Sequence, residues 1–293
     1  MRIFVFLSLL TLLLGACNAP QEPAASPSPS ATTATAQTGR KAQGETLVVT
    51  TVAPLTNIIS NIAGERVKVQ GIIPEGTDSH TFEPRPSDSD LMSQADLIIV
   101  NGLELEVPTL KLASSAKPQE TEIYQLGPNT ITETDYVFDA SFPKEGGKPN
   151  PHLWVSTNYA RAYAKLSAAK LKELDPEGAN YYDTNLKTYL QRLDELDQVT
   201  REVVNSIPPE NRKLLTYHDS WAYWAKEYGF KVIGAIQPSD FNEPSAQDVA
   251  KLIDQIRASK VPAIFGSEVF PSEVEEQIAR EAKVKVANTS DDD

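Results

Sequence analysis

The sequence predicts an α/β protein with two βα lobes, each built on a mostly parallel four-stranded sheet, and a long rigid helix that joins them. Three observations support this prediction. Short runs rich in Val and Ile alternate with helical stretches, which is typical of parallel sheets covered by helices. The strand-like runs form two groups of similar size, one in each half of the chain. A helical region, residues 158–207, separates the two groups.

The predicted strands and helices alternate within each group. The first set of strands is Thr46–Val52, Val67–Pro74, Ala95–Gly102 and Thr121–Leu126. The second set is Lys213–Tyr217, Lys231–Ile236, Ala263–Gly266 and Lys283–Ala287. The predicted helices between them are Leu55–Ala63, Ser87–Gln94, Ala222–Tyr228, Ala246–Ser259 and Ser272–Ala282. We therefore assign one lobe to residues 45–157 and the other to residues 208–293.

The helical region between the lobes has two parts. Asn158–Leu174 is rich in good helix formers. Asp175-Pro176 then starts a second helix, because Asp is a favoured N-cap and Pro a favoured first helical residue. From Pro176 to Ser206, Tyr, Leu and Val recur on one face, including Leu196 and Val199. Such a helix is about 45 Å long, and we expect it to limit hinge motion between the lobes.

The first 44 residues predict export and anchoring. Residues 1–16 have the charged start, short apolar run and small residues of a signal peptide. Leu14-Gly15-Ala16-Cys17 resembles a bacterial lipobox, which predicts cleavage before Cys17 and lipidation of its sulfur; an ordinary signal peptide that contains a cysteine is the alternative. Cys17 is the only cysteine, so no disulfide within the chain competes for it. Residues 17–44 are rich in Ala, Ser, Thr and Pro and predict a flexible tether.

The composition restricts the partners. The formal net charge is −13, whereas phosphate binding needs a basic surface, so nucleic acid is excluded. We expect an extracytoplasmic monomer that a lipid anchor holds at a bacterial membrane, in the periplasm or on the outer face of the cell.

The chain has only three histidines, and each lies in a short loop near an apolar run: His80, His152 and His218. Imidazole is the commonest protein ligand for transition metals. Since parallel sheets bind ligands beyond the carboxyl ends of their strands, the three side chains predict one metal site. A carboxylate from the acidic segment after Lys283–Ala287 would complete four-coordination.

Over about residues 45–293 the chain resembles the cluster A-I (cluster 9) solute-binding lipoproteins of zinc or manganese ABC transporters. The matching motifs are Gly76–Pro84, Asn101–Glu106, Asn150–Trp154, Thr216–Trp221 and Val261–Phe265. The resemblance implies a metal held between two lobes and delivery of that metal to a membrane permease, with no catalysis.

The resemblance also implies the ligands. By position it gives His80 and His152 from the first lobe and His218 and Asp291 from the second, with Asp292 as an alternative to Asp291. Members of the family continue beyond this aspartate through a further helical stretch, so we expect the second lobe to be truncated at Asp293.

The third ligand bears on the choice of metal. It is Glu in many manganese binders of the family and His in many zinc binders, so His218 favours Zn²⁺. Mn²⁺ stays an alternative, because the long His-rich loop of many zinc members is missing from Phe142–Asn150. Since imidazoles bind metals in their neutral form, we expect affinity to fall as the pH drops through about 6.

Two other classes of function stay open at this point. A zinc hydrolase would hold its metal with three histidines and leave one position open for water. We expect no enzyme, because neither a His-Glu-x-x-His motif nor a Gly-rich phosphate loop occurs. The other class is an adhesin or structural lipoprotein in which the metal is incidental.

Overall fold

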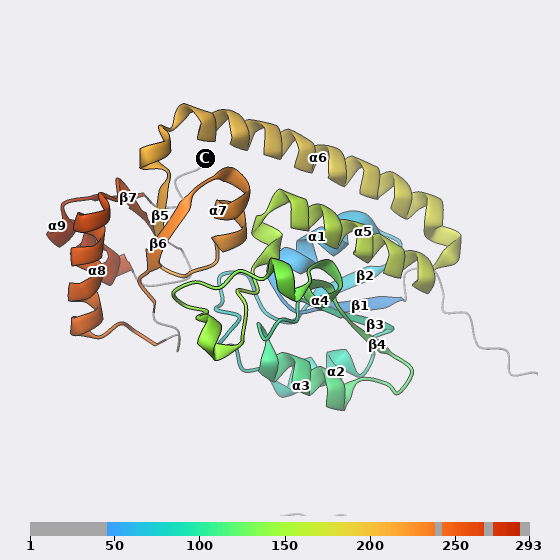
Figure 1. Cartoon of the computed structure of the whole chain (residues 1–293). Helices are drawn as coiled ribbons and strands as arrows, with labels where there is room; N and C mark the ends of the chain where they lie inside the picture. Colours follow the sequence, from blue (N-terminus) through green and yellow to red (C-terminus); the bar gives the residue numbers. More distant parts are fainter. Residues whose placement is uncertain (1–45, 238–241, 267–271, 288–293) are drawn as a thin grey trace, which may run out of the picture. The chain divides into compact units, whose positions relative to one another are not determined.

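The computed structural model describes residues 46–237, 242–266 and 272–287 (Figure 1). The chain divides into two compact units, residues 1–40 and 41–293, and every described element belongs to the second. This unit contains two parallel four-stranded sheets with flanking helices, and a long helix lies between them in the sequence. The predicted fold class is therefore confirmed. The predicted signal peptide, Cys17, the tether, Asp291 and Asp292 lie outside the described residues.

The first sheet has the strand order β2-β1-β3-β4, with all pairs parallel. Its strands are β1 (Leu47–Thr50), β2 (Lys68–Gly71), β3 (Leu97–Val100) and β4 (Glu122–Gln125). Its helices are α1 (Ala53–Ala63), α2 (Pro86–Met92), α3 (Val107–Ala116) and α4 (Leu126–Thr130). Figure 1 shows α1 and the later helix α5 (Thr157–Leu174) on one face and α2 and α3 on the other. Both faces are covered, which explains why β1 and β3 are buried along their whole length.

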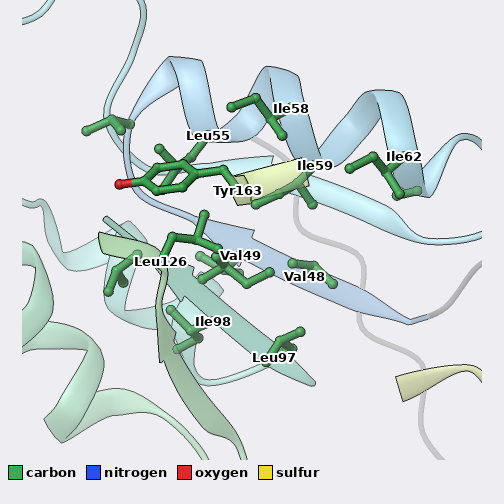
Figure 2. Packing of buried hydrophobic residues seen from close by; sticks show 14 of the residues in the cluster. Val48, Val49, Leu55, Ile58, Ile59, Ile62, Leu97, Ile98, Leu126 and Tyr163 are labelled. Atoms are coloured by element: carbon green, nitrogen blue, oxygen red, sulfur yellow. The ribbon is translucent and has the colours of Figure 1, made fainter. Parts of the chain in front are cut away.

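The core of this lobe lies between α1 and the sheet (Figure 2). Apolar side chains recur at helical spacing along α1, so one face of the helix meets the strands. These residues are Leu55, Ile58, Ile59 and Ile62. Figure 2 shows them on the side of α1 that faces the strands carrying Val48, Val49 and Ile98, with Tyr163 from α5 beside them.

The second sheet repeats the same topology, in the order β6-β5-β7-β8. Its strands are β5 (Lys213–Thr216), β6 (Lys231–Ala235), β7 (Ala263–Phe265) and β8 (Lys285–Ala287). Its helices are α7 (Ala222–Tyr228), α8 (Ala246–Ser259) and α9 (Ser272–Ala282). A smaller core, including Leu215, Ile256 and Ile264, packs between this sheet and its helices.

The long helix, α6 (Ala179–Ser206), has 28 residues and packs on α1 and α5. It begins later than predicted, because Pro176–Gly178 forms a 3-10 turn. Asp175 is the N-cap of this turn, as predicted, but its side chain makes no cap hydrogen bond: the carboxylate accepts hydrogen bonds from Arg66 (2.8 Å) and from Tyr182 Oη (2.7 Å).

The predicted apolar stripe of α6 is buried only in part. Leu193 is buried, but Leu196 and Val199 are 54% and 57% exposed. The helical rhythm of the sequence thus predicted the helix correctly and the extent of its buried face incorrectly.

Short 3-10 turns complete the chain trace. They are Glu133–Asp135, Lys144–Gly146, Leu153–Val155 and Pro209–Asn211. Among the residues that the structure describes, no helix combines the length and the apolar character needed to cross a bilayer.

Candidate metal centre

The three histidines lie together. The Nε2 atom of His152 is 3.2 Å from Nε2 of His80 and 3.2 Å from Nε2 of His218. The possible ligand atoms of all three lie within 4.8 Å of one another. Two imidazoles on one tetrahedral zinc ion, with Zn–N bonds of about 2.0 Å, have nitrogens roughly 3.3 Å apart. The spacing therefore suits a shared ion.

Three loops place these side chains. His80 lies between β2 and α2, His218 lies two residues after the end of β5, and His152 precedes the 3-10 turn that leads into α5. The backbone N–H of His80 donates to Asp78 Oδ1 (2.9 Å), so Asp78 closes a local turn around His80.

Asn150 fixes the tautomer of His152. The Nδ2 group of Asn150 donates to Asp139 Oδ2 (2.7 Å) and to the carbonyl oxygen of Asp219. Its Oδ1 atom must then be the acceptor for His152 Nδ1, at 2.9 Å. With the proton on Nδ1, the lone pair of Nε2 points to the other two imidazoles.

Gln237 has the same role for His218. Its Oε1 atom is 2.7 Å from His218 Nδ1, and its backbone N–H donates to the carbonyl of Tyr217 (2.8 Å). The sequence reasoning missed Gln237. A usable signal was the pairing of β5 with β6, since Thr216 lies opposite Ala235 and the residues two positions further on are His218 and Gln237.

Burial keeps the imidazoles neutral. Loss of hydration lowers the pKa of His80 and of His152 well below the usual value, and charge on His218 lowers both further. Burial also lowers the pKa of His218, although Gln237, Asp78 and Asp139 oppose this effect. All three imidazoles are therefore uncharged at neutral pH, which is the form that can bind a metal ion.

A second buried group lies behind the histidines. The Asp219 side chain does not cap the helix that follows, because α7 has Trp221 at its N-cap and no side-chain cap. The Asp219 carboxylate instead accepts from the backbone N–H of Ser141 (3.4 Å). Burial and the charge of Asp139 raise the pKa of Asp219 to about 8, so these two carboxyl groups share a proton at neutral pH.

The side chain of Glu106 organises the loop after β3. It is buried, and its Oε1 atom accepts from Thr51 Oγ1 (2.6 Å) and from the backbone N–H of Asn101 (2.7 Å). The Nδ2 group of Asn101 donates to the carbonyl of Pro151 (3.0 Å), next to His152. These contacts give Glu106 a structural role.

An aromatic ring covers the three imidazoles. The Phe142 ring centroid is 5.6 Å from that of His80, 5.7 Å from His152 and 6.3 Å from His218. Trp154 packs against the ring of His152, at 5.2 Å. The sequence gives no sign of this position, because a phenyl ring carries no ligand atom.

Comparison with known proteins identifies the family of the chain. The family model described as "Zinc-uptake complex component A periplasmic" matches residues 48–292. A relative, the manganese ABC transporter substrate-binding lipoprotein PsaA of Streptococcus anginosus, is 33% identical over 74% of this chain and 71% of its own length.

Two solved structures share the fold. The periplasmic zinc-binding protein TroA from Treponema pallidum has a TM-score of 0.76 and 29% identity, covering 84% of this chain and 88% of its own. A manganese-bound periplasmic metal-binding protein from Candidatus Liberibacter asiaticus has a TM-score of 0.72 and 25% identity, covering 85% and 92%. The protein therefore belongs to the zinc-uptake component A (ZnuA) family, whose members are extracytoplasmic metal-binding components of ABC transporters and not enzymes.

Proposed function

We propose that the protein captures a divalent transition metal ion with His80, His152, His218 and Asp291 and delivers it to the permease of an ABC transporter. The observation that carries this proposal is the meeting of three Nε2 atoms within 4.8 Å of one another. The contacts of Asn150 and Gln237 support it, because they direct two of the lone pairs to one point. The ion is the cargo, so binding has to be reversible.

Replacement of single ligands tests the site. We expect His80→Ala, His152→Ala and His218→Ala each to weaken metal binding by more than about 100-fold. This loss is larger than the usual loss when a residue that only orients a metal ligand is replaced. Asp291→Ala and Asp292→Ala should differ, with the large loss in the variant that removes the fourth ligand. Wild-type affinity in all five variants would refute the proposal. In cells, His152→Ala should abolish metal-dependent growth if the protein serves transport. If the protein were an adhesin, the same substitution would leave this growth unchanged.

Zinc is the proposed cargo, with manganese as the alternative. Three neutral nitrogen donors suit zinc, whereas manganese accepts more oxygen ligands. The named relatives include zinc and manganese proteins, so they favour neither. Affinity alone does not decide, because most sites bind zinc more tightly than manganese. Elemental analysis of the protein purified from its native host, together with competition titration of both ions, tests the assignment; manganese as the main bound metal would reverse it.

The proposed location is the outer side of a bacterial membrane, with lipid on the sulfur of Cys17. The relative from Streptococcus anginosus is named a lipoprotein, and residues 14–17 resemble a lipobox. Cys17→Ser should move the protein from the membrane fraction to the soluble extracytoplasmic fraction. A variant that stays in the membrane fraction would contradict the anchor.

A further inference from the structure

The segment Asp139–Phe142, here called the strap, forms a closed turn over the metal centre. The backbone N–H of Asp139 donates to the carbonyl of Phe142 (3.0 Å), and the backbone N–H of Phe142 donates to Asp139 Oδ1 (3.0 Å). These two bonds fix the direction in which the Phe142 side chain leaves the backbone. The ring is 7% exposed and lies against all three imidazoles.

The strap also contacts the residues that orient two of the histidines. At one end, Asp139 Oδ2 accepts from Asn150, which in turn accepts from His152. Nearer the other end, Ser141 Oγ donates to the backbone carbonyl of Gln237 (3.3 Å), whose side chain accepts from His218. A displacement of the strap therefore alters contacts behind both imidazoles.

The contacts differ in strength along the strap. The bond between Asp139 and Asn150 is short, at 2.7 Å, whereas the bonds of Ser141 to Gln237 and to Asp219 are 3.3 and 3.4 Å long. Beyond Phe142 the chain is exposed over residues 143–148 and includes Gly146-Gly147. Ser141 is thus held more weakly than Asp139, and beyond Phe142 the strap continues into solvent-exposed chain.

We propose that the strap is the gate of the metal site and that Phe142 controls the rates at which the ion enters and leaves. A phenyl ring supplies no ligand atom, so its effect is on access to the three Nε2 atoms and not on coordination. When the gate opens, the hydrogen bonds of Ser141 break and the Phe142 ring turns away from the three imidazoles. The hydrogen bond from Asn150 to Asp139 stays in place and keeps the strap attached. This gate rests on the proposed function.

Stopped-flow kinetics tests the gate. The purified protein is loaded with Zn²⁺ or Mn²⁺ and mixed with excess EDTA, and association is measured separately with the free ion. Phe142→Ala should raise both rate constants about tenfold, which corresponds to a barrier lower by about 1.4 kcal/mol, and Phe142→Leu should raise them less. Because both rates rise, the dissociation constant should change less than the rate of release.

A matched control has the same residue type in the same part of the chain. Phe138 lies four positions upstream, and its ring packs on Tyr136 at 6.5 Å. Phe138→Ala should release the ion at the wild-type rate. The Co²⁺ absorption spectrum should be identical in all these variants, since a gate leaves the ligands unchanged.

The outcomes separate the gate from the proposed function. If the wild-type protein binds neither ion, the proposed function fails. If it binds but neither Phe142 variant changes the rates, the gate is wrong. The gate is also wrong if release accelerates with an unchanged association rate, or if the Co²⁺ spectrum changes. If Phe142→Ala does not fold, the rate constants and Co²⁺ spectra of Phe142→Leu and Ser141→Ala test the gate by the same criteria.

Discussion

Asn150 accepts two hydrogen bonds from the same histidine, one from Nδ1 of His152 (2.9 Å) and one from its backbone N–H (3.0 Å). One amide oxygen therefore sets both the tautomer of this side chain and the placement of its backbone. Since the Asn150 amide is itself oriented by the Asp139 carboxylate and by the backbone carbonyl of Asp219, two side chains and one backbone group together orient a single donor atom.

Asn150→Ala should weaken zinc binding by about 10- to 100-fold, the usual cost of losing a partner that orients a metal ligand. Competition titration with a zinc indicator measures the change. Asn129→Ala is the matched control, because the Asn129 amide donates to the carbonyl of Gln125 on the surface. An Asn150→Ala protein with wild-type affinity would show that His152 needs no orienting partner.

Zinc affinity should be nearly constant from about pH 8 to about pH 6.5, the ordinary imidazole pKa, and fall at lower pH. Burial lowers the pKa of His80, His152 and His218, so the metal-free protein holds no proton on them in the upper range. Protons therefore compete with zinc only at pH values below the pKa of a solvated imidazole. Isothermal titration across this range measures the effect, and a steep loss of affinity between about pH 8 and about pH 7 would contradict it.

Asp175→Asn should destabilise the protein at neutral pH and have less effect in acid. Burial raises the pKa of Asp175, but hydrogen bonds from Tyr182 and Arg66 outweigh burial and hold the pKa below its usual value. A carboxyl group with a lowered folded-state pKa stabilises the fold above its unfolded pKa of about 3.9, and this contribution disappears as the pH falls through the folded value.

Urea unfolding near pH 7 and near pH 3, about one unit below the unfolded pKa, measures this difference. Asp183→Asn is the control, because Asp183 pairs with Lys172 at the surface and is half exposed. An Asp175→Asn effect that is equally large at both pH values would exclude the ionised pair as its cause.

Leu55→Ala should lower the free energy of unfolding by about 2–5 kcal/mol, because Leu55 is fully buried between α1 and the first sheet. Leu196→Ala removes the same atoms from a side chain that is 54% exposed, and it should change stability by no more than about 0.5 kcal/mol. Chemical denaturation measures both. Equal losses in the two variants would mean that Leu196 is buried in solution.

The sequence predicted the alternation of strands and helices because covered parallel strands such as β1 and β3 are continuous apolar runs. It predicted that the three histidines lie together, because they are few and because His80 and His218 lie in loops that follow strands. It did not predict that Leu196 is exposed, since helical spacing identifies a face but not the part of the helix that has a neighbour. The contact of Asp175 with Arg66 joins residues far apart in the sequence, which local capping rules do not consider.

The residues around the ligands were harder to find for a related reason. Gln237 reaches His218 through the pairing of β5 with β6, so its role depends on strand register. Phe142 has no donor atom, so a search for metal-binding side chains passes over it, and its position depends on the turn that Asp139 closes.

Glu106 has a consequence for the range of ligands that the first lobe can accept. In sheets of this order, the crevice between the first and third strands commonly receives phosphates and other anions at free backbone N–H groups. Here the N–H groups of Asn101 and Gly102 already donate to the carboxylate of Glu106, a residue of the same loop. A carboxyl group of the protein itself thus occupies the two N–H groups that an external phosphate would need, which closes this crevice to nucleotides.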